Sequence, residues 1–272
     1  MRRTLTGVPG WSRRGFCRVR RDMRTLPAGR PPRGAALLAL GGLILAACAS
    51  GGKTATSSRA GRTPDPLVQP DPRSETAAPD TFDVRFETSR GPVTVRVARA
   101  WAPRGADRLY YLVRHRYYDG TRFFRVIPRF AAQFGAAADP RVTKVWETRT
   151  IPDDPVRRGN ARGFVSFATA GPNTRTTQLF VNLVNNFRLD RLGFAPVGRV
   201  VDGMAVVDSL YSGYGEGAPS GRGPDQDRIA AEGNRYLERE FPRLDYVRTA
   251  TVVRTASAPP APAAARSGAR QR

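Results

Sequence analysis

Residues 82–87 and 93–97 each alternate apolar with polar side chains, and Ser89, Arg90 and Gly91 lie between them. Alternation with a period of two is typical of a β-strand that buries one face. Two such runs separated by a short polar segment with glycine indicate a β-hairpin. This pattern constrains the fold most, because the apolar face of a hairpin has to be covered by further strands or helices.

A helix is predicted next. Pro103 suits the first helical position, and apolar residues then follow the i, i+3, i+4, i+7 spacing of one helical face, namely Ala106, Leu109, Tyr110 and Val113. The helix should end near His115, before the turn at residues 118–120. A histidine at that end is expected to be solvated and favoured by the helix dipole.

The rest of the folded region contains short strands separated by Gly, Pro and Asn, at residues 123–126, 164–168, 179–181 and 197–201, and a second helix at residues 204–210. This order predicts a mainly β fold with some α: a closed antiparallel β-barrel capped by two helices. An extra helix is expected near residues 225–238, with Asp225 or Asp227 at its start.

The net charge of +22 comes almost entirely from arginine, since Lys53 and Lys144 are the only lysines. The arginines are spread along the chain, and no zinc-finger spacing, aromatic RNA-binding motif or basic zipper is present, so no specific nucleic-acid partner is expected. An anionic-lipid or nucleic-acid binder would rest on charge alone. A content of 40% hydrophobic residues argues against a wholly disordered chain.

Two cysteines and one histidine limit the chemistry. Cys17 and Cys48 both precede the folded region, so disulfides and cysteine-ligated metals are excluded there. His115 alone cannot form a multi-histidine site. No glycine-rich, phosphate-binding loop precedes a helix. We therefore expect neither metal nor cofactor.

Residues 35–47 are thirteen apolar or glycine residues that follow Arg30 and Arg33. This run is too short to span a bilayer, which needs about 20 residues, and has the length of a signal-peptide core. It closes with Leu-Ala-Ala-Cys at residues 45–48, which resembles the lipobox of bacterial lipoproteins and implies lipidation of Cys48. The alternative is a short buried helix that ends in cysteine.

Four segments follow from these patterns. Residues 1–47 are predicted to be a signal peptide, with Met1 or Met23 as the start, and residues 48–79 the lipidated Cys48 and a flexible tether. Residues 80–255 form the domain, and residues 256–272 a disordered Ala/Pro/Arg tail. Ala49 stands where a retention signal would carry aspartate, which implies an anchor in the outer membrane, facing the periplasm.

Residues 123–135, FFRVIPRFAAQFG, resemble the FHRxIPxFxxQGG segment of cyclophilin-type peptidyl-prolyl cis-trans isomerases. Three further segments resemble motifs of that family in the same order: residues 166–174 (SFATAGPNT), 178–181 (QLFV) and 189–200 (LD to GRV). The resemblance covers roughly residues 80–255. It implies the cyclophilin fold and isomerisation of X-Pro bonds.

The resemblance also implies site residues. Arg125 matches the catalytic arginine and Gln133 the amide that anchors the substrate backbone. The implied substrate-binding residues are Phe130, Ala131, Ala168, Thr169, Gln178, Phe180 and Leu189. The simpler interpretation is that Phe130 and Phe180 are core aromatics and Arg125 is one arginine among many.

Three departures from the family pattern leave a second function open. Ala131 replaces a methionine, Arg188 a tryptophan and Gly193 a pocket histidine, which predicts weaker binding of proline and of cyclosporin. The expected function is an isomerase that assists the folding of exported proteins and acts on proline-containing, unfolded chains as a monomer. The alternative is a catalytically weak, cyclophilin-like peptide-binding or chaperone module of the cell envelope.

Overall fold

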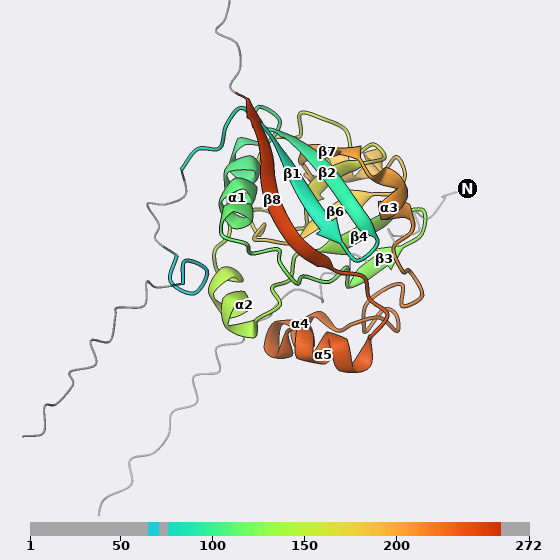
Figure 1. Ribbon diagram of the computed structural model, residues 1–272. Coiled ribbons are helices and arrows are strands. Elements are labelled where there is room, and N and C mark those ends of the chain that lie inside the picture. The colour runs from blue at the N-terminus through green and yellow to red at the C-terminus, as the bar shows by residue number, and fades with distance from the viewer. Residues whose placement is uncertain (1–64, 71–75, 257–272) are drawn as a thin grey trace, which may run out of the picture. The chain divides into compact units, whose positions relative to one another are not determined.

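The computed structural model describes residues 65–70 and 76–256. Its strands are β1 (Thr81–Thr88), β2 (Gly91–Ala98), β3 (Arg125–Ile127), β4 (Ala131–Phe134), β5 (Phe164–Phe167), β6 (Leu179–Asn182), β7 (Pro196–Asp202) and β8 (Val247–Ala256). They form one sheet in the order β3-β4-β6-β5-β7-β2-β1-β8 (Figure 1). Every ladder is antiparallel, as predicted.

The predicted hairpin is confirmed, because β1 and β2 pair in register from Thr81–Ala98 to Thr88–Gly91. The alternating apolar side chains of both strands are buried: Phe82, Val84, Phe86, Val93, Val95 and Val97. They form the main core together with the apolar face of the first helix. The hairpin therefore supplies one wall of the sheet.

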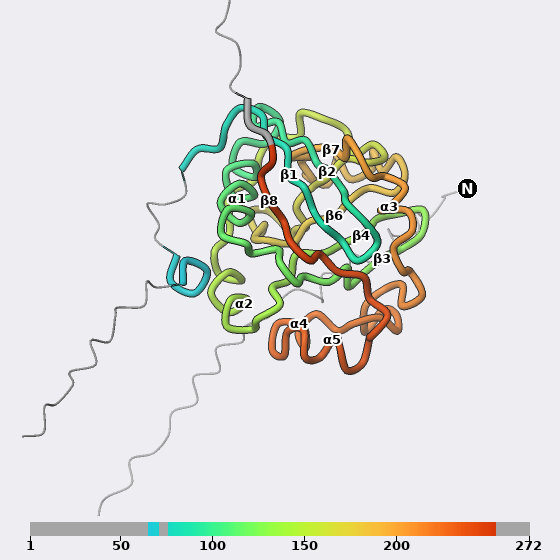
Figure 2. Tube along the Cα trace, in the orientation of Figure 1, coloured from blue at the N-terminus to red at the C-terminus, as the bar shows by residue number. Residues whose placement is uncertain are grey.

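The sheet curls so that its first and last strands approach each other. Phe123 donates its backbone N–H to Asp245 at 2.9 Å, and Gly120 and Val247 are bonded at 2.8 Å. An antiparallel bridge between Arg122 and Tyr246 lies between them. On its other side β8 pairs with β1, so the last strand in the sequence of the domain lies beside the first (Figure 2). The predicted mainly β fold of antiparallel strands with some helices is thus confirmed, and its strands form one curled sheet.

Five α-helices and a 3₁₀-helix accompany the sheet in the described residues: α1 (Pro103–Arg114), α2 (Pro140–Trp146), α3 (Met204–Asp208), α4 (Gln226–Glu232), α5 (Asn234–Glu240) and η2 (Phe187–Leu192). The helices predicted at residues 103–115 and 204–210 are α1 and α3. Pro103 occupies the start of α1, as expected. The sequence interpretation missed α2, β4 and β8.

The prediction of a single helix at residues 225–238 is wrong in one respect, because the structure has two separate helices there, α4 and α5. Gly233 between them has φ +60° and ψ −144°, and a Cβ there would overlap the backbone oxygen of Ala138. This close approach requires glycine and ends α4. The predicted start is confirmed, since the Asp225 side chain accepts the N–H of Arg228 at 3.0 Å.

The α4–α5 pair packs on Phe124, which occupies the position after the first Phe of the 123–135 segment. Phe124 is 2% exposed and belongs to a separate apolar cluster with Ile229, Tyr236, Leu237 and Leu244. Figure 1 shows the two helices side by side at one end of the sheet. An apolar residue at Phe124 is therefore explained by the helices that cover it.

Residues 65–70, which fall in the expected tether, form a turn with contacts of their own. Trp146 donates its indole N–H to the Leu67 oxygen at 2.9 Å, and Tyr111 donates to the Pro66 oxygen at 3.3 Å. Leu67 and Val68 pack against the main core. This stretch is therefore docked on the domain through α1 and α2.

The predicted signal peptide, Cys48 and residues 257–272 lie outside the described residues. Within the described ranges, no helix has the length and apolar character needed to cross a membrane.

Candidate active site

A small apolar cluster lies apart from the main core. It gathers six buried residues from β4, β6, η2 and the ends of neighbouring strands, each at most 6% exposed: Phe130, Ala131, Ala168, Phe180, Leu189 and Phe194. Five of the six were predicted as substrate-binding residues from the sequence. The structure therefore brings these five residues into one cluster, while their roles in binding stay predictions.

Arg125 lies beside this cluster at the start of β3. It pairs across the β3–β4 ladder with Gln133, and its Nη1 donates to Gln133 Oε1 at 3.2 Å. Its Cζ atom is 5.5 Å from the centre of the Phe130 ring, a cation–π distance. The side chain is 4% exposed. The guanidinium is therefore fixed between an amide and an aromatic face.

The amide of Gln133 continues a chain of polar side chains. Its Nε2 donates to Gln178 Oε1 at 2.9 Å, and Gln178 in turn donates to Gln226 of α4 at 3.4 Å. Gln133 is also directly opposite Phe180 in the β4–β6 register. The structure thus brings together Arg125 and both predicted glutamines.

The backbone behind Gln178 is held by two buried tyrosines. Tyr117 donates to the Thr177 hydroxyl and Tyr118 to the Thr177 carbonyl oxygen, both at 2.9 Å. Burial raises the pKa of both phenols, so they remain protonated donors at neutral pH. These contacts hold the backbone at Thr177, directly before Gln178 and the start of β6.

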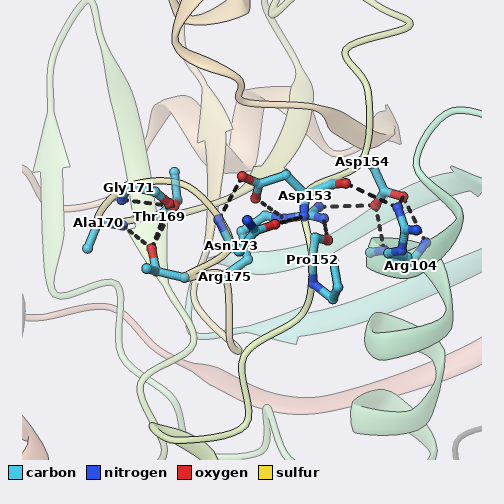
Figure 3. Close-up of polar contacts among 11 residues, drawn as sticks. Arg104, Pro152, Asp153, Asp154, Thr169, Ala170, Gly171, Asn173 and Arg175 are labelled. Carbon is cyan, nitrogen blue, oxygen red and sulfur yellow. Dashed lines mark hydrogen bonds and ion pairs between the residues drawn. The ribbon is translucent and has the colours of Figure 1, made fainter.

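Thr169 lies in the 169–178 loop, which is closed by its own hydrogen bonds (Figure 3). The Thr169 hydroxyl contacts Thr174 at 2.8 Å and the Gly171 oxygen, and Ala170 N–H donates to the Thr174 hydroxyl at 2.9 Å. The Ala168 N–H donates to the Gln178 oxygen at 2.9 Å across the base of the loop. The hydroxyl of Thr169 therefore shapes the loop.

Asp153 holds the same loop from outside. Asp153 and Asn173 exchange hydrogen bonds between side chain and backbone at 2.8 and 2.7 Å, and Arg175 donates to Asp153 at 3.1 Å (Figure 3). Asp154 accepts from Arg175 at 3.1 Å and from the Gly105 N–H in α1 at 2.9 Å. The loop that carries Thr169 is thus anchored to the start of α1.

Two departures from the family pattern have a structural account. Gly193 ends η2 with φ +84°, a left-handed conformation that favours glycine. The next residue, Phe194, is 4% exposed and packs edge-on against Phe180 with ring centres 5.6 Å apart. Arg188 places its guanidinium 5.4 Å from the Phe130 ring centre. The cluster is therefore bordered by Arg125 and Arg188.

Glu216, which the sequence interpretation missed, completes the site. Its carboxylate accepts from Arg125 Nε at 2.6 Å and from Nη2 at 2.7 Å. The signal that could have revealed it is the run Gly215-Glu216-Gly217, where one acidic residue lies within a glycine-rich segment. No cluster of three potential metal ligands occurs among the residues that the structure describes.

The fold is a curled, eight-stranded antiparallel sheet, and an arginine and a glutamine pair on adjacent strands beside a small apolar cluster. Comparison with known proteins identifies the family that has this arrangement. The family model described as "Cyclophilin type peptidyl-prolyl cis-trans isomerase/CLD" matches residues 83–231, more than half of the chain. The chain belongs to this family, and the prediction of a peptidyl-prolyl isomerase domain is confirmed at that level. The matched region ends within α4, so α5 and β8 follow it.

Two named relatives are peptidyl-prolyl cis-trans isomerases. The chain is 35% identical to peptidyl-prolyl cis-trans isomerase ppi1 of Schizosaccharomyces pombe, over 47% of this chain and 84% of that protein. It is 30% identical to a peptidyl-prolyl cis-trans isomerase of Acinetobacter baylyi, over 47% of this chain and 70% of that protein. A crystal structure of a cyclophilin-type isomerase of Cryptosporidium parvum aligns at 19% identity with a TM-score of 0.49, covering 65% and 99% of the two chains.

Proposed function

We propose that the protein isomerises X-Pro bonds of exported polypeptides at the periplasmic face of a membrane, with Arg125 stabilising the twisted imide. The observation that carries the proposal is the fixed position of Arg125, bonded to Gln133 and lying 5.5 Å from Phe130 beside the apolar cluster. Family membership supports the reaction, and the arrangement of side chains supports the residue roles.

Isomerisation of an X-Pro bond requires rotation about the bond and no covalent chemistry. Rotation about an X-Pro bond meets a barrier of about 18–20 kcal/mol from amide resonance, and no covalent bond breaks. A catalyst has only to bind the twisted state more strongly than the planar one. In that state the imide nitrogen has lost its conjugation and accepts a hydrogen bond, which the Arg125 guanidinium can donate.

The apolar cluster and the glutamine would hold the substrate. The proline ring packs against Phe130, Phe180 and Leu189, and Gln133 binds the neighbouring backbone through its amide. Ala131 takes less volume than the family's methionine, so ring contact is weaker. Ala168 and Thr169 would contact the residue before proline.

The place of action is inferred from the leader. An Arg-flanked apolar run of thirteen residues that ends in Leu-Ala-Ala-Cys supports export and lipidation at Cys48. Ala49 supports an outer-membrane destination, and unfolded, proline-containing chains that have just crossed the inner membrane are the proposed substrates.

The alternative is a catalytically weak binding module of the cell envelope. The observation that favours it is the combination of Ala131, Arg188 and the missing pocket histidine at Gly193, which reduces contact with proline. Both functions predict binding of Pro-containing peptides, but only the first predicts turnover.

A protease-coupled assay with X-Pro peptides on the full chain separates the two functions. We expect a rate well above the uncatalysed one. Binding of the same peptides without a rate would replace the enzyme with the binding module. Palmitate labelling tests the anchor: we expect label in the wild type and none in Cys48→Ala, and label or membrane retention that persists in the variant would contradict lipidation at Cys48.

A further inference from the structure

Glu216 binds the guanidinium of Arg125 along one edge. The two bonds, Nε to Oε1 at 2.6 Å and Nη2 to Oε2 at 2.7 Å, form a bidentate pair. Such a pair fixes the orientation of a guanidinium as well as its position. With the bond from Nη1 to Gln133, all three nitrogens of Arg125 have named acceptors.

The segment that carries Glu216 is folded around it. The backbone oxygen of Glu216 accepts the Gly223 N–H at 2.8 Å, and its own Oε1 accepts the Gly217 N–H at 3.0 Å. A Cβ at Gly223 would lie 2.8 Å from the Glu216 oxygen, and one at Gly221 would overlap that oxygen. The glycines therefore allow the chain to close over Glu216 and present its carboxylate in one place.

Aromatic packing ties this segment to the α4–α5 pair. The Tyr214 ring lies 5.1 Å from that of Tyr211 and 5.0 Å from that of Phe241, both in edge-on contacts. Tyr214 packs against the same apolar cluster as Phe124. The region after α3 thus reaches the site twice, through Glu216 at Arg125 and through Gln226 at Gln178.

We propose that Glu216 is a positioning residue that holds the Arg125 guanidinium in the orientation used for isomerisation. The role rests on the proposed function. An arginine side chain loses rotamer entropy when it is fixed. Because Glu216 already holds Arg125 in the folded protein, this entropy is lost during folding and not again at each catalytic event. Arg125 is 4% exposed, so Glu216 also supplies its counter-charge.

The alternative role for a carboxylate in this place is competition with the substrate for the N–H groups of Arg125. Removal of Glu216 would change kcat/KM in opposite directions under these two roles. Removal of a positioning residue lowers kcat with little change in KM, whereas removal of a competitor lowers KM and raises kcat/KM.

The experiment measures kcat and KM for an X-Pro peptide with the full chain in a double-mutant cycle. In Glu216→Gln, the new NH₂ group faces an N–H donor of Arg125, so one of the two bonds is lost. We expect kcat to fall about tenfold with KM within twofold. In an Arg125→Lys background, Glu216→Gln should change kcat by less than twofold, because the fork that Glu216 binds is absent.

Glu238→Gln is the matched control. Glu238 lies on α5 and accepts from Arg122 Nη2 at 2.6 Å, so the substitution breaks an arginine–glutamate pair of the same region that does not involve Arg125. We expect unchanged kcat and KM. If Glu216→Gln does not fold, Glu216→Asp keeps the charge but not the reach, and its kcat should also fall.

An unchanged or raised kcat in the folded Glu216 variants, or an equal fall in the Arg125→Lys background, overturns the positioning role alone. A wild-type chain with no rate above the uncatalysed one overturns the proposed function and this role with it. The two failures are therefore distinguished by the wild-type rate.

Discussion

Arg175 and Asp154 form a buried ion pair, with Nη1 and Oδ2 3.1 Å apart and side chains that are 2% and 0% exposed. Arg175 lies in the 169–178 loop, and Asp154 also accepts backbone N–H groups of Arg104 and Gly105 in α1 at 3.1 and 2.9 Å. The pair therefore links the loop beside the site to the helix that packs on the main core (Figure 3).

Arg175→Met should destabilise the domain strongly. Loss of one partner from a buried pair leaves an uncompensated charge and costs about 3–5 kcal/mol. Arg104→Met is the control, because the Arg104 side chain is 54% exposed and 4.0 Å from Asp154, and exposed pairs contribute at most about 1 kcal/mol. Urea unfolding followed by circular dichroism measures both. Equal losses in the two variants would contradict the importance of the buried pair.

Phe130→Ala should act mainly on substrate binding. Phe130 would touch planar and twisted substrates alike, so we expect KM to rise several-fold and kcat to stay within twofold, with a stability loss of about 3–5 kcal/mol. Phe164→Ala is the control: Phe164 stacks on Trp101 with ring centres 5.7 Å apart, outside the apolar cluster. It should lose stability without raising KM. A parallel rise in both variants would show that KM follows stability alone.

His115 should make stability depend on pH near neutrality. Partial burial, with Arg114 nearby, lowers the pKa of His115, which also packs 4.3 Å from Tyr111. This differs from the solvated, dipole-favoured histidine that the sequence indicated. The unfolded state then binds the proton more readily, so stability is full above the unfolded pKa of about 6.5 and falls as the pH drops below it.

Two measurements check this pH dependence. The chain has one histidine, so its ring signals in an NMR titration are unambiguous and should give a pKa below 6.5. Unfolding free energies at pH 7.5 and 5.5 should differ less in His115→Gln than in the wild type. A pKa at or above the ordinary value would contradict the burial argument.

The elements that were predictable from the sequence depend on local patterns. The alternation in residues of β1 and β2 and the helical spacing in α1 predicted these elements correctly, because each element buries one face against the same core. α2 was predictable in principle, since Asp139 caps it by accepting the Arg141 N–H at 2.8 Å and Pro140 follows. Its length of seven residues gave too little periodicity to recognise.

The elements that were not predictable depend on contacts between distant residues. Glu216 pairs with Arg125 across 91 positions of sequence, and no spacing rule connects them. The break at Gly233 is likewise set by the backbone of Ala138. The predicted site residues were found through motifs, whereas the acidic partner of the proposed catalytic arginine belongs to a region without such a motif.

The most direct test is kcat/KM for an X-Pro peptide in the wild type, Arg125→Ala and Arg125→Lys, with folding checked by circular dichroism. If the guanidinium stabilises the twisted imide, Arg125→Ala should lower kcat/KM by about 10²–10³-fold, or about 3–4 kcal/mol. Arg125→Lys should recover only part, because it keeps the charge without the planar fork. A folded Arg125→Ala variant with the wild-type kcat/KM would contradict the role of Arg125.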